Sequence, residues 1–165
     1  MKEDPAFSYT GVDFAGPLTI RVDHVTGSWK VWICLFTSLV TRAVHLDIVT
    51  DMSTQSYLRC LKRFASRRGL PRKFVSDNGK TFKAASKYIK AASKYIKAVF
   101  EDHTIEEHLI GLRCAWQFNV KRAPWCGGAF ERLIKSTKHC LRKMIVRAHF
   151  SFDELLTTVT EIMAE

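Results

Sequence analysis

The sequence predicts an α/β domain with a mixed, five-stranded sheet and helices on both faces of that sheet. Three β-rich segments near the start are separated by short breaks, which favours an antiparallel meander. A helical pattern then connects this meander to a further short strand, and that order favours a parallel addition to the same sheet. Amphipathic segments later in the chain supply further helices.

The three segments of the meander are defined by their composition and by their ends. Residues 9–14 are predicted as a short strand that stops at Gly16-Pro17, because this pair breaks strands. Residues 30–40 are rich in β-branched and aromatic side chains, and residues 42–50 alternate apolar and polar positions. The break between these two segments is short, so we expect a hairpin.

A helix followed by a strand extends the pattern. Asp51 or Ser53 can cap the start of the helix, and Gly69 followed by Pro71 predicts its end. Apolar residues recur between them at helical spacing: Tyr57, Leu58, Leu61, Phe64 and Ala65. Residues 73–76 then form a short strand that would carry Asp77 at its C-terminal end.

An exact tandem repeat of seven residues covers 84–90 and 91–97. Seven residues are nearly two helical turns, so both copies present almost the same face of one helix, offset by roughly 20°. The apolar residues that this register would keep on one stripe are Tyr88, Ile89, Tyr95, Ile96 and Val99. We interpret the repeat as a lengthened helix without chemistry of its own.

The last third of the chain predicts one strand, one loop and two helices. Residues 115–120 are the fifth strand, and the pair Gly127-Gly128 predicts a mobile loop, because glycine has the most backbone freedom to lose. Residues 129–147 have a helical pattern, and a capping box at 151–154 opens a final helix. The apolar faces of these helices are Phe130, Leu133, Ile134, Leu141 and Ile145, and Leu155, Leu156, Val159, Ile162 and Met163.

Composition indicates a globular, intracellular and non-secreted chain. Apolar residues make up 47% and charged residues 25% of the sequence, which is typical of an ordered domain. The longest apolar stretch covers only residues 31–36, whereas a membrane span needs about 20 residues. The five cysteines are scattered without a C-x-x-C pair, so we expect reduced thiols and no zinc site.

The charge and its distribution favour a polyanionic partner. Lys and Arg number 26 against 16 Asp and Glu, which gives a net charge of +10. Asp77 is the only acid in residues 52–100, and Glu131 is the only acid in residues 108–152. Acids that merely balanced surface charge would be scattered, so we expect these two to serve a local purpose.

Three carboxylates occupy positions that a catalytic role explains better than a structural role does. Asp13 lies within an apolar strand, Asp77 follows another strand, and Glu131 opens a basic helix. Mg²⁺ or Mn²⁺ prefers carboxylate oxygens, and two such ions about 4 Å apart support phosphoryl transfer. We therefore predict a site for two ions. Each acid also has a simpler interpretation, as a turn residue for the aspartates and as a first-turn acid favoured by the helix dipole for Glu131.

The helix after the glycine pair adds a basic stripe to this prediction. Lys135 and Lys138 follow Glu131 by four and seven residues, so they share its face, and Arg142 continues the stripe. A phosphate backbone that enters an active site would need such cations. A merely solvated basic face is the alternative.

Four segments together resemble the core domain of retroviral and long-terminal-repeat retrotransposon integrases, and within them the Pao/BEL group of animal retrotransposons. These segments are YTGVDFAGP at 9–17, TRAVHL at 41–46, SDNGKTF at 76–82 and APWCGGAFERLIKSTK at 123–138. The resemblance covers nearly the whole chain, and the four motifs occur in the family's order.

This resemblance implies an RNase H-like fold and the acidic triad of the family at Asp13, Asp77 and Glu131. It places Asn78 as an orienting group beside the second aspartate, and it places Lys135 and Lys138 at positions that contact the DNA end. The implied reaction is trimming of the DNA 3′ end, followed by attack of the new 3′-hydroxyl on target DNA.

The resemblance also carries expectations about organisation and partners. Residues 1–165 would be the catalytic core domain, without an N-terminal zinc domain or a C-terminal DNA-binding domain, and ending before the natural C-terminal boundary. The expected partners are element ends, target DNA and further copies of the chain, in the nucleus. Two alternatives stay open. One is a non-catalytic DNA-binding relic, and the other is an RNase H-type nuclease, although the further carboxylate usual in such nucleases has no obvious candidate here.

Overall fold

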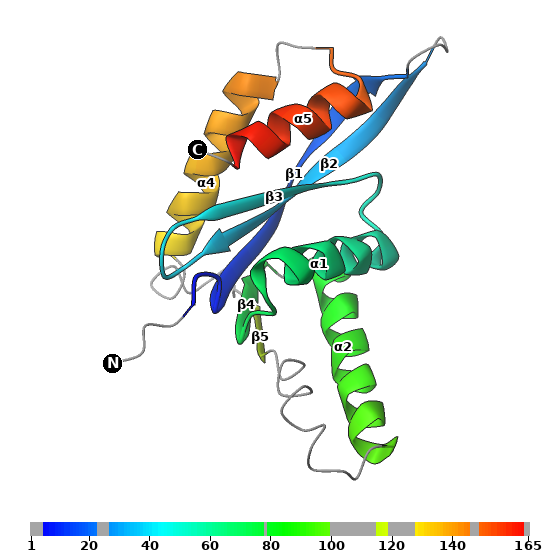
Figure 1. Cartoon of the computed structure of the whole chain (residues 1–165), viewed down its shortest axis with the longest axis vertical. Helices are drawn as coiled ribbons and strands as arrows, with labels where there is room; N and C mark the ends of the chain where they lie inside the picture. Colours follow the sequence, from blue (N-terminus) through cyan, green and yellow to red (C-terminus); the bar gives the residue numbers. More distant parts are fainter. Residues whose placement is uncertain are drawn as a thin grey trace.

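A mixed β-sheet forms the centre of the structure, with its strands in the order β3-β2-β1-β4-β5 (Figure 1). The computed structural model describes residues 5–22, 27–77, 79–99, 115–118, 128–145 and 149–163. The strands are β1 (Tyr9–Arg21), β2 (Ser28–Ser38), β3 (Val44–Val49), β4 (Lys73–Ser76) and β5 (Ala115–Phe118). The helices are α1 (Thr54–Arg68), α2 (Lys80–Val99), α4 (Gly128–Ile145) and α5 (Phe152–Ile162).

The pairing of the strands confirms the predicted mixed α/β architecture. β1, β2 and β3 pair antiparallel in chain order, as a meander does. β4 then pairs in parallel with β1, after the crossover through α1, and β5 pairs in parallel with β4. A right-handed strand–helix–strand crossover is the usual way to add a parallel strand, which explains why α1 stands between β3 and β4 in the sequence.

β1 is longer than the sequence predicts. The strand does not stop at Gly16-Pro17 but continues through this pair. The register with β2 shifts between Ala15 and Leu18, so the pair lies in a β-bulge, where proline need not donate a ladder hydrogen bond. Gly16 has a φ of 133°, which favours glycine, and an added Cβ would lie 3.1 Å from a side chain of β2. The predicted strand end was therefore wrong, because the breaker sits in a bulge.

One face of the sheet is covered by α1 and α2. Side chains that point to this face form a buried cluster with both helices. Phe36 of β2 stacks on Phe64 of α1, with ring centroids 4.1 Å apart, and Phe14 of β1 stacks on Phe82 of α2 at 5.0 Å. These aromatic contacts add to the area burial that holds the helices on the sheet.

The opposite face of the sheet is covered by α4 and α5, so the helices lie on both faces as predicted (Figure 1). Successive residues of β2 point to opposite faces, and Ile33 and Leu35 therefore belong to this second cluster. α4 contributes Leu141 to the cluster and α5 contributes Leu155 and Val159, all of them buried. Leu156 of α5 was expected on the same face but is 41% exposed.

Two helix ends match their sequence signals in atomic detail. The Ser53 hydroxyl accepts the N–H of Ser56 at 3.2 Å and caps α1, while Asp51 instead accepts the N–H of Ser53. At α5 the Ser151 hydroxyl accepts the N–H of Glu154, and the Glu154 carboxylate accepts the N–H of Ser151 at 2.8 Å. The predicted capping box is therefore confirmed.

The duplicated heptad lies within α2, which is one helix of 20 residues. Phe82 and Ala85 of its first turns are buried, and Ile89 is half-buried. Tyr88 was expected on the same stripe but is 58% exposed. Neighbouring residues of a helix point about 100° apart, so Tyr88 and Ile89 cannot both face the sheet. The side chains of the other three stripe residues lie outside the described part: Tyr95, Ile96 and Val99.

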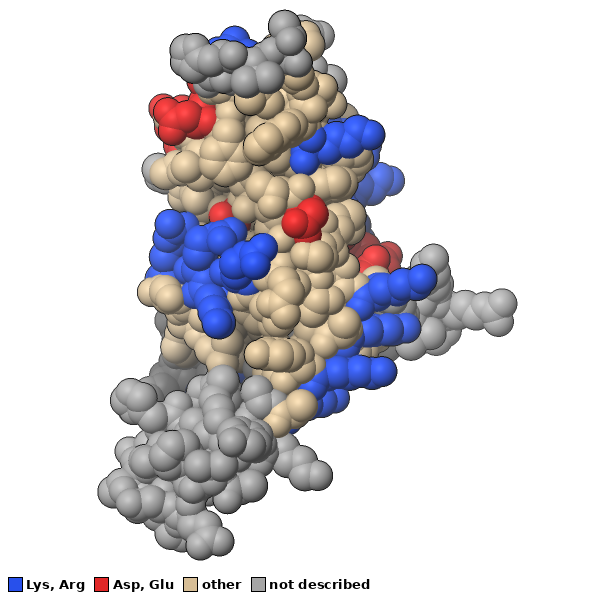
Figure 2. All heavy atoms as spheres, turned by 90° about the vertical axis from the view of Figure 1, so that its right-hand side faces the viewer, with Lys and Arg blue, Asp and Glu red and all other residues tan. Residues whose placement is uncertain are grey.

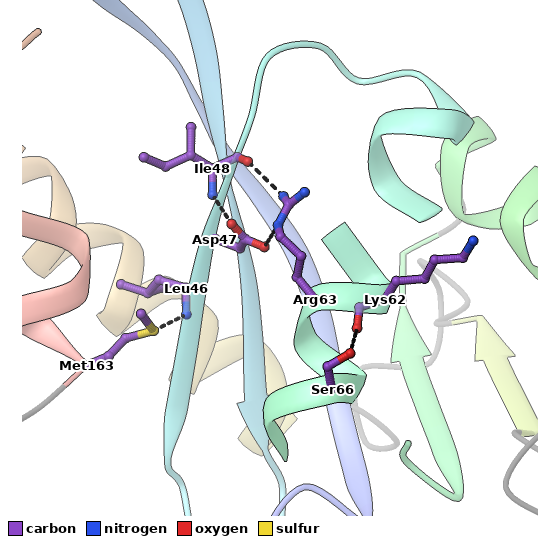
Figure 3. Close-up of polar contacts among 7 residues, drawn as sticks. All are labelled: Leu46, Asp47, Ile48, Lys62, Arg63, Ser66 and Met163. Atoms are coloured by element: carbon purple, nitrogen blue, oxygen red, sulfur yellow. Dashed lines mark hydrogen bonds and ion pairs between the residues drawn. The ribbon is translucent and has the colours of Figure 1, made fainter. Parts of the chain in front are cut away.

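Side chains contact three backbone groups of the edge strand β3 (Figure 3). Asp47 accepts the N–H of Ile48 at 2.8 Å, and Arg63 of α1 donates to the Asp47 carboxylate at 2.7 Å and to the Ile48 carbonyl at 3.2 Å. The N–H of Leu46 lies 3.0 Å from the Sδ of Met163. Occupied backbone groups protect an edge strand against the addition of another strand.

Basic side chains are concentrated on the exposed surface of α1 and α2. Figure 2 shows groups of Lys and Arg on the face of the molecule where these helices lie. The exposed basic residues on the two helices are Arg59, Lys62, Arg63, Arg67, Arg68, Lys80, Lys83, Lys87 and Lys90. No helix in the described part of the chain is long and apolar enough to span a bilayer.

Candidate active site

A cavity of about 700 Å³ brings together the three carboxylates that the sequence singled out. Asp13 comes from β1, Asp77 follows β4, and Glu131 lies in the first turn of α4. The basic residues predicted on α4 line the same cavity, namely Lys135, Lys138 and Arg142. Residues that are far apart in the sequence thus share one hollow at the edge of the sheet.

The two aspartates are brought together by the parallel pairing of β1 and β4. Val12 is the register partner of Ser76, so Asp13 and Asp77 are the next residues along two neighbouring strands that run in the same direction. β4 ends at Ser76, whereas β1 continues to Arg21, so Asp77 leaves the sheet next to a residue that lies within β1. The short strand β4 therefore positions Asp77 beside Asp13.

Glu131 reaches the cavity because α4 is anchored on the sheet beyond it. Ile134, one turn after Glu131, is buried against Val75 of β4. Leu141 and Ile145 then hold the rest of the helix in the second core cluster. Apolar residues at helical spacing thus fix the side of α4 that faces the sheet.

Both oxygens of the Asp13 carboxylate have a hydrogen-bond donor. Oδ1 accepts the backbone N–H of Phe14 at 2.8 Å, and Oδ2 accepts the Lys138 ammonium at 2.6 Å. The side chains of Asp13 and Lys138 are each 26% exposed, so this ion pair is partly shielded from water. Both residues were predicted as site residues, but their ion pair was not predicted.

Asp77 lies in a tight turn and is also part of the cavity wall. Its Oδ1 accepts the N–H of Gly79 at 2.9 Å, and its carbonyl accepts the Ser76 hydroxyl at 3.0 Å. A Cβ at position 79 would lie only 2.9 Å from that Oδ1, so a larger residue there would displace the Asp77 carboxylate. The turn interpretation of Asp77 and the metal interpretation are therefore compatible, since the turn fixes the carboxylate at the rim.

Three further polar residues of α4 line the cavity and were not predicted as site residues: Arg132, Ser136 and His139. The signal for His139 was present, because it follows Lys135 by four residues and hence lies on the same helical face. Arg132 and Ser136 are each the immediate neighbour of a selected residue.

Some predicted site residues fall elsewhere. Asn78 and Gly127 lie outside the described residues. Gly128 was assigned to a flexible loop, but it is the first residue of α4 and is half-buried. Glycine at a helix start is tolerated because its backbone is only partly constrained there, so the loop prediction was one residue too long at this end.

The three carboxylates are suitable ligands for a hard divalent cation, but their side chains are too far apart to bind one ion together. Carboxylate oxygens are the ligands that Mg²⁺ and Mn²⁺ prefer, and all three acids share the cavity. Within the described part of the chain, no three His, Cys, Asp or Glu side chains lie close enough together to hold an ion. Metal binding would therefore require these side chains to move towards one another.

Solved structures with a similar fold are integrase structures from retroviruses. One is a chain of the simian T-cell lymphotropic virus intasome in complex with PP2A regulatory subunit B56 gamma, with a TM-score of 0.56 and 12% identity, covering 94% of this chain and 47% of that chain. Another is the HTLV-2 integrase catalytic core domain in complex with magnesium, in a trimeric form, with a TM-score of 0.54 and 12% identity, covering 96% and 84%.

The likeness shows that this chain has the fold of a retroviral integrase catalytic core, in agreement with the RNase H-like expectation. The chain spans about half the length of the matched intasome chain. No protein-family model matches the sequence, and no curated protein matches it either.

Proposed function

We propose that this domain is the catalytic core of a retrotransposon integrase of the Pao/BEL type, a metal-dependent polynucleotidyl transferase that acts on DNA ends in the nucleus. The observation that carries the proposal is the shared cavity, in which carboxylates from β1, β4 and α4 meet a basic helix face. The fold supports it, because the cavity lies at the carboxyl end of β4, and the similar structures are an intasome and an integrase catalytic core domain in complex with magnesium.

Each residue of the cavity has a role in this proposal. Asp13, which lies within β1, and Asp77, which directly follows β4, would hold the metal, and Glu131 would complete the ligand set from α4. Two bound Mg²⁺ or Mn²⁺ ions supply activation of the attacking oxygen and stabilisation of the leaving oxygen. Lys135 and Arg142, both exposed, would bind the phosphates of the DNA end.

We further propose that the active form is an assembly of several copies on DNA. The similar proteins include an intasome and a trimeric catalytic core. The excess of Lys and Arg over Asp and Glu suits binding to DNA in more than one place, and the exposed basic residues of α1 and α2 belong to helices on the face of the sheet opposite to α4 (Figure 1).

A strand-joining assay with Asp77→Asn tests the proposal. Asparagine preserves the size of the side chain and can still accept the Gly79 N–H, so the turn should survive while the negative charge is lost. We expect a folded protein without metal-dependent joining. Joining by Asp77→Asn at the rate of the unmodified protein would contradict the proposal.

A non-catalytic DNA-binding module is the second candidate, and the arrangement of Asp13 favours it. In such a module the Lys138 ion pair would be permanent and the carboxylates would have no metal to hold. DNA affinity would then be indifferent to Mg²⁺. Salt dependence cannot separate the two functions, because phosphate contacts make both steeply salt-dependent. A titration of DNA with and without Mg²⁺ separates them directly.

A further inference from the structure

Lys138 pairs with a carboxylate that the proposed function assigns to metal binding. Its Nζ lies 2.6 Å from Oδ2 of Asp13, and the backbone N–H of Phe14 already holds the other oxygen. Asp13 is thus oriented by the strand itself, and the ammonium is not needed for that purpose. What Lys138 adds is a positive charge beside Oδ2, in a cavity that both residues line.

A metal ion and this ammonium are unfavourable neighbours. A divalent cation binds a carboxylate oxygen at about 2.1 Å. If it shared Oδ2 with Lys138, the two cations would lie at most about 5 Å apart in a site that is only partly exposed to water. Like charges at that separation repel strongly, so one cation tends to exclude the other.

The Lys138 ammonium can bind another anion once it leaves Asp13. It lies on the cavity side of α4 together with Lys135 and Arg142, which are both exposed. A lysine ammonium is a compact charge on a flexible four-carbon stem, so it can change partner without movement of the helix. Glu131 and Asp77 line the same cavity, but the proposed function assigns both carboxylates to the metal, which leaves a phosphate of bound DNA as the anion for Lys138.

We propose that Lys138 is a built-in counter-ion of Asp13, which the first metal ion displaces, and that the displaced ammonium then binds DNA phosphate. This inference rests on the proposed function. Metal loading would convert Lys138 from a competitor of the metal into a contact of the substrate. Metal and DNA would therefore bind cooperatively, each raising the affinity of the other by the same factor, as linkage requires.

Binding of Mn²⁺ alone, followed by electron paramagnetic resonance, tests the first half of the inference. Lys138→Met keeps the apolar stem and removes the charge. We expect it to bind Mn²⁺ about 5- to 10-fold more tightly than the unmodified protein, at the lower end of typical coupling between sites. Lys135→Met, a cation on the same face that forms no ion pair in the described structure, should change Mn²⁺ affinity much less.

DNA affinity tests the second half, measured by fluorescence anisotropy on a duplex with blocked 3′ ends. Mn²⁺ should raise the affinity of the unmodified protein and of Lys135→Met, although the latter binds more weakly throughout. The gain should disappear in Lys138→Met. Lys138→Arg retains the charge and should retain the gain, which guards against a loss caused only by misfolding.

The outcomes distinguish this inference from the proposed function. If Lys138→Met binds Mn²⁺ no more tightly than the unmodified protein, while Asp77→Asn abolishes Mn²⁺ binding, the metal site stands and the counter-ion role of Lys138 is wrong. If the unmodified protein binds no Mn²⁺ that depends on Asp77, both the inference and the proposed metal chemistry fail.

Discussion

Asp13 on β1 and Asp47 on β3 have the same local bonding pattern in two different regions of the molecule. In each, Oδ1 accepts the backbone N–H of the following residue at 2.8 Å. In each, Oδ2 accepts a hydrogen bond from a cationic side chain on a helix. The donor is Lys138 of α4 at 2.6 Å for Asp13 and Arg63 of α1 at 2.7 Å for Asp47. The two aspartates lie on the strands that flank β2 on either side.

The surroundings of the two pairs differ, and that difference separates a structural contact from a functional one. Arg63 also donates to the Ile48 carbonyl, and the side chain of Asp47 is only 9% exposed, so the pair is fully bonded and closes the sheet edge (Figure 3). The Asp13 pair opens instead into the cavity that Asp77 and Glu131 also line. A fork-shaped guanidinium suits a permanent contact, whereas a flexible ammonium suits an exchangeable one.

The largest expected difference between the two aspartates is in catalytic activity. Asp13→Asn should reduce metal-dependent strand joining more than about 100-fold, because even residues that only orient metal ligands affect metal affinity or activity by 10- to 100-fold. Asp47→Asn should leave joining by the folded protein nearly unchanged. Rates measured on the same branched DNA substrate compare the two. Equal losses in both variants would show that the two aspartates do not differ in function.

The next effect is on stability at low pH and belongs to the region around β3. His45 is 1% exposed and packs against Phe36 and Phe64, and neither ring nitrogen has a hydrogen-bond partner in the described part of the chain. Burial, and secondarily the charge of Arg68, lowers the pKa of His45 from 6.5 to about 4, against a smaller raising effect of Asp47.

The sign of the pH effect follows from which state binds the proton more tightly. The unfolded chain protonates His45 near pH 6.5, whereas the folded chain does so only near pH 4. The free energy of unfolding should therefore be intact above pH 6.5 and fall by about 3 kcal/mol as the pH drops to 4. Urea unfolding at several pH values checks this, with His45→Phe as the control. A parallel pH profile in the control would contradict the assignment to His45.

Removal of the β3 contact should have a moderate effect on stability. Asp47→Ala leaves the Ile48 N–H and the Arg63 guanidinium without their carboxylate, which costs about 1–3 kcal/mol. Asp13→Ala also leaves the Phe14 N–H without its carboxylate, but it should cost less than about 1 kcal/mol, since Lys138 can then be hydrated in the cavity. Chemical denaturation at neutral pH measures both. A larger loss of unfolding free energy in Asp13→Ala than in Asp47→Ala would show that the Asp13 pair is the structural one.

The smallest expected effect comes from a third ion pair, between Arg21 of β1 and Glu154 of α5. Its side chains are 52% and 50% exposed, and the two atoms lie 2.9 Å apart. Solvent screening leaves exposed pairs with little net stabilisation. Arg21→Ala should therefore leave the midpoint of thermal unfolding unchanged within error. A drop of several degrees would show that exposure is a poor guide to the contribution of these pairs.

Local signals in the sequence were sufficient for the elements whose ends depend on neighbouring residues. Ser53, Gly69 and the capping box at Ser151 act within one helical turn, so the sequence predicts them well. Gly16-Pro17 was misjudged, because a β-bulge depends on the register with β2 and not on the pair itself. Such register is a tertiary property that local patterns do not contain.

The candidate site shows the same division. The spacing of Glu131, Lys135 and Lys138 on one helix predicted that they would share a face, and all three line the cavity. The ion pair of Lys138 with Asp13 joins residues 125 positions apart, and no local pattern encodes it. The equivalent Asp47–Arg63 pair was missed for a similar reason, since it depends on how α1 packs beside β3.

Mn²⁺-dependent strand joining on a branched DNA substrate, with Glu131→Gln as the matched variant, tests the central claim most directly. Glu131 is exposed and takes part in no core cluster, so its replacement should not disturb the fold. The account predicts joining by the unmodified protein and none by Glu131→Gln at equal DNA affinity. Joining that persists in Glu131→Gln, or a folded unmodified protein that binds DNA and Mn²⁺ but joins nothing, would contradict the assignment of this cavity as the active site.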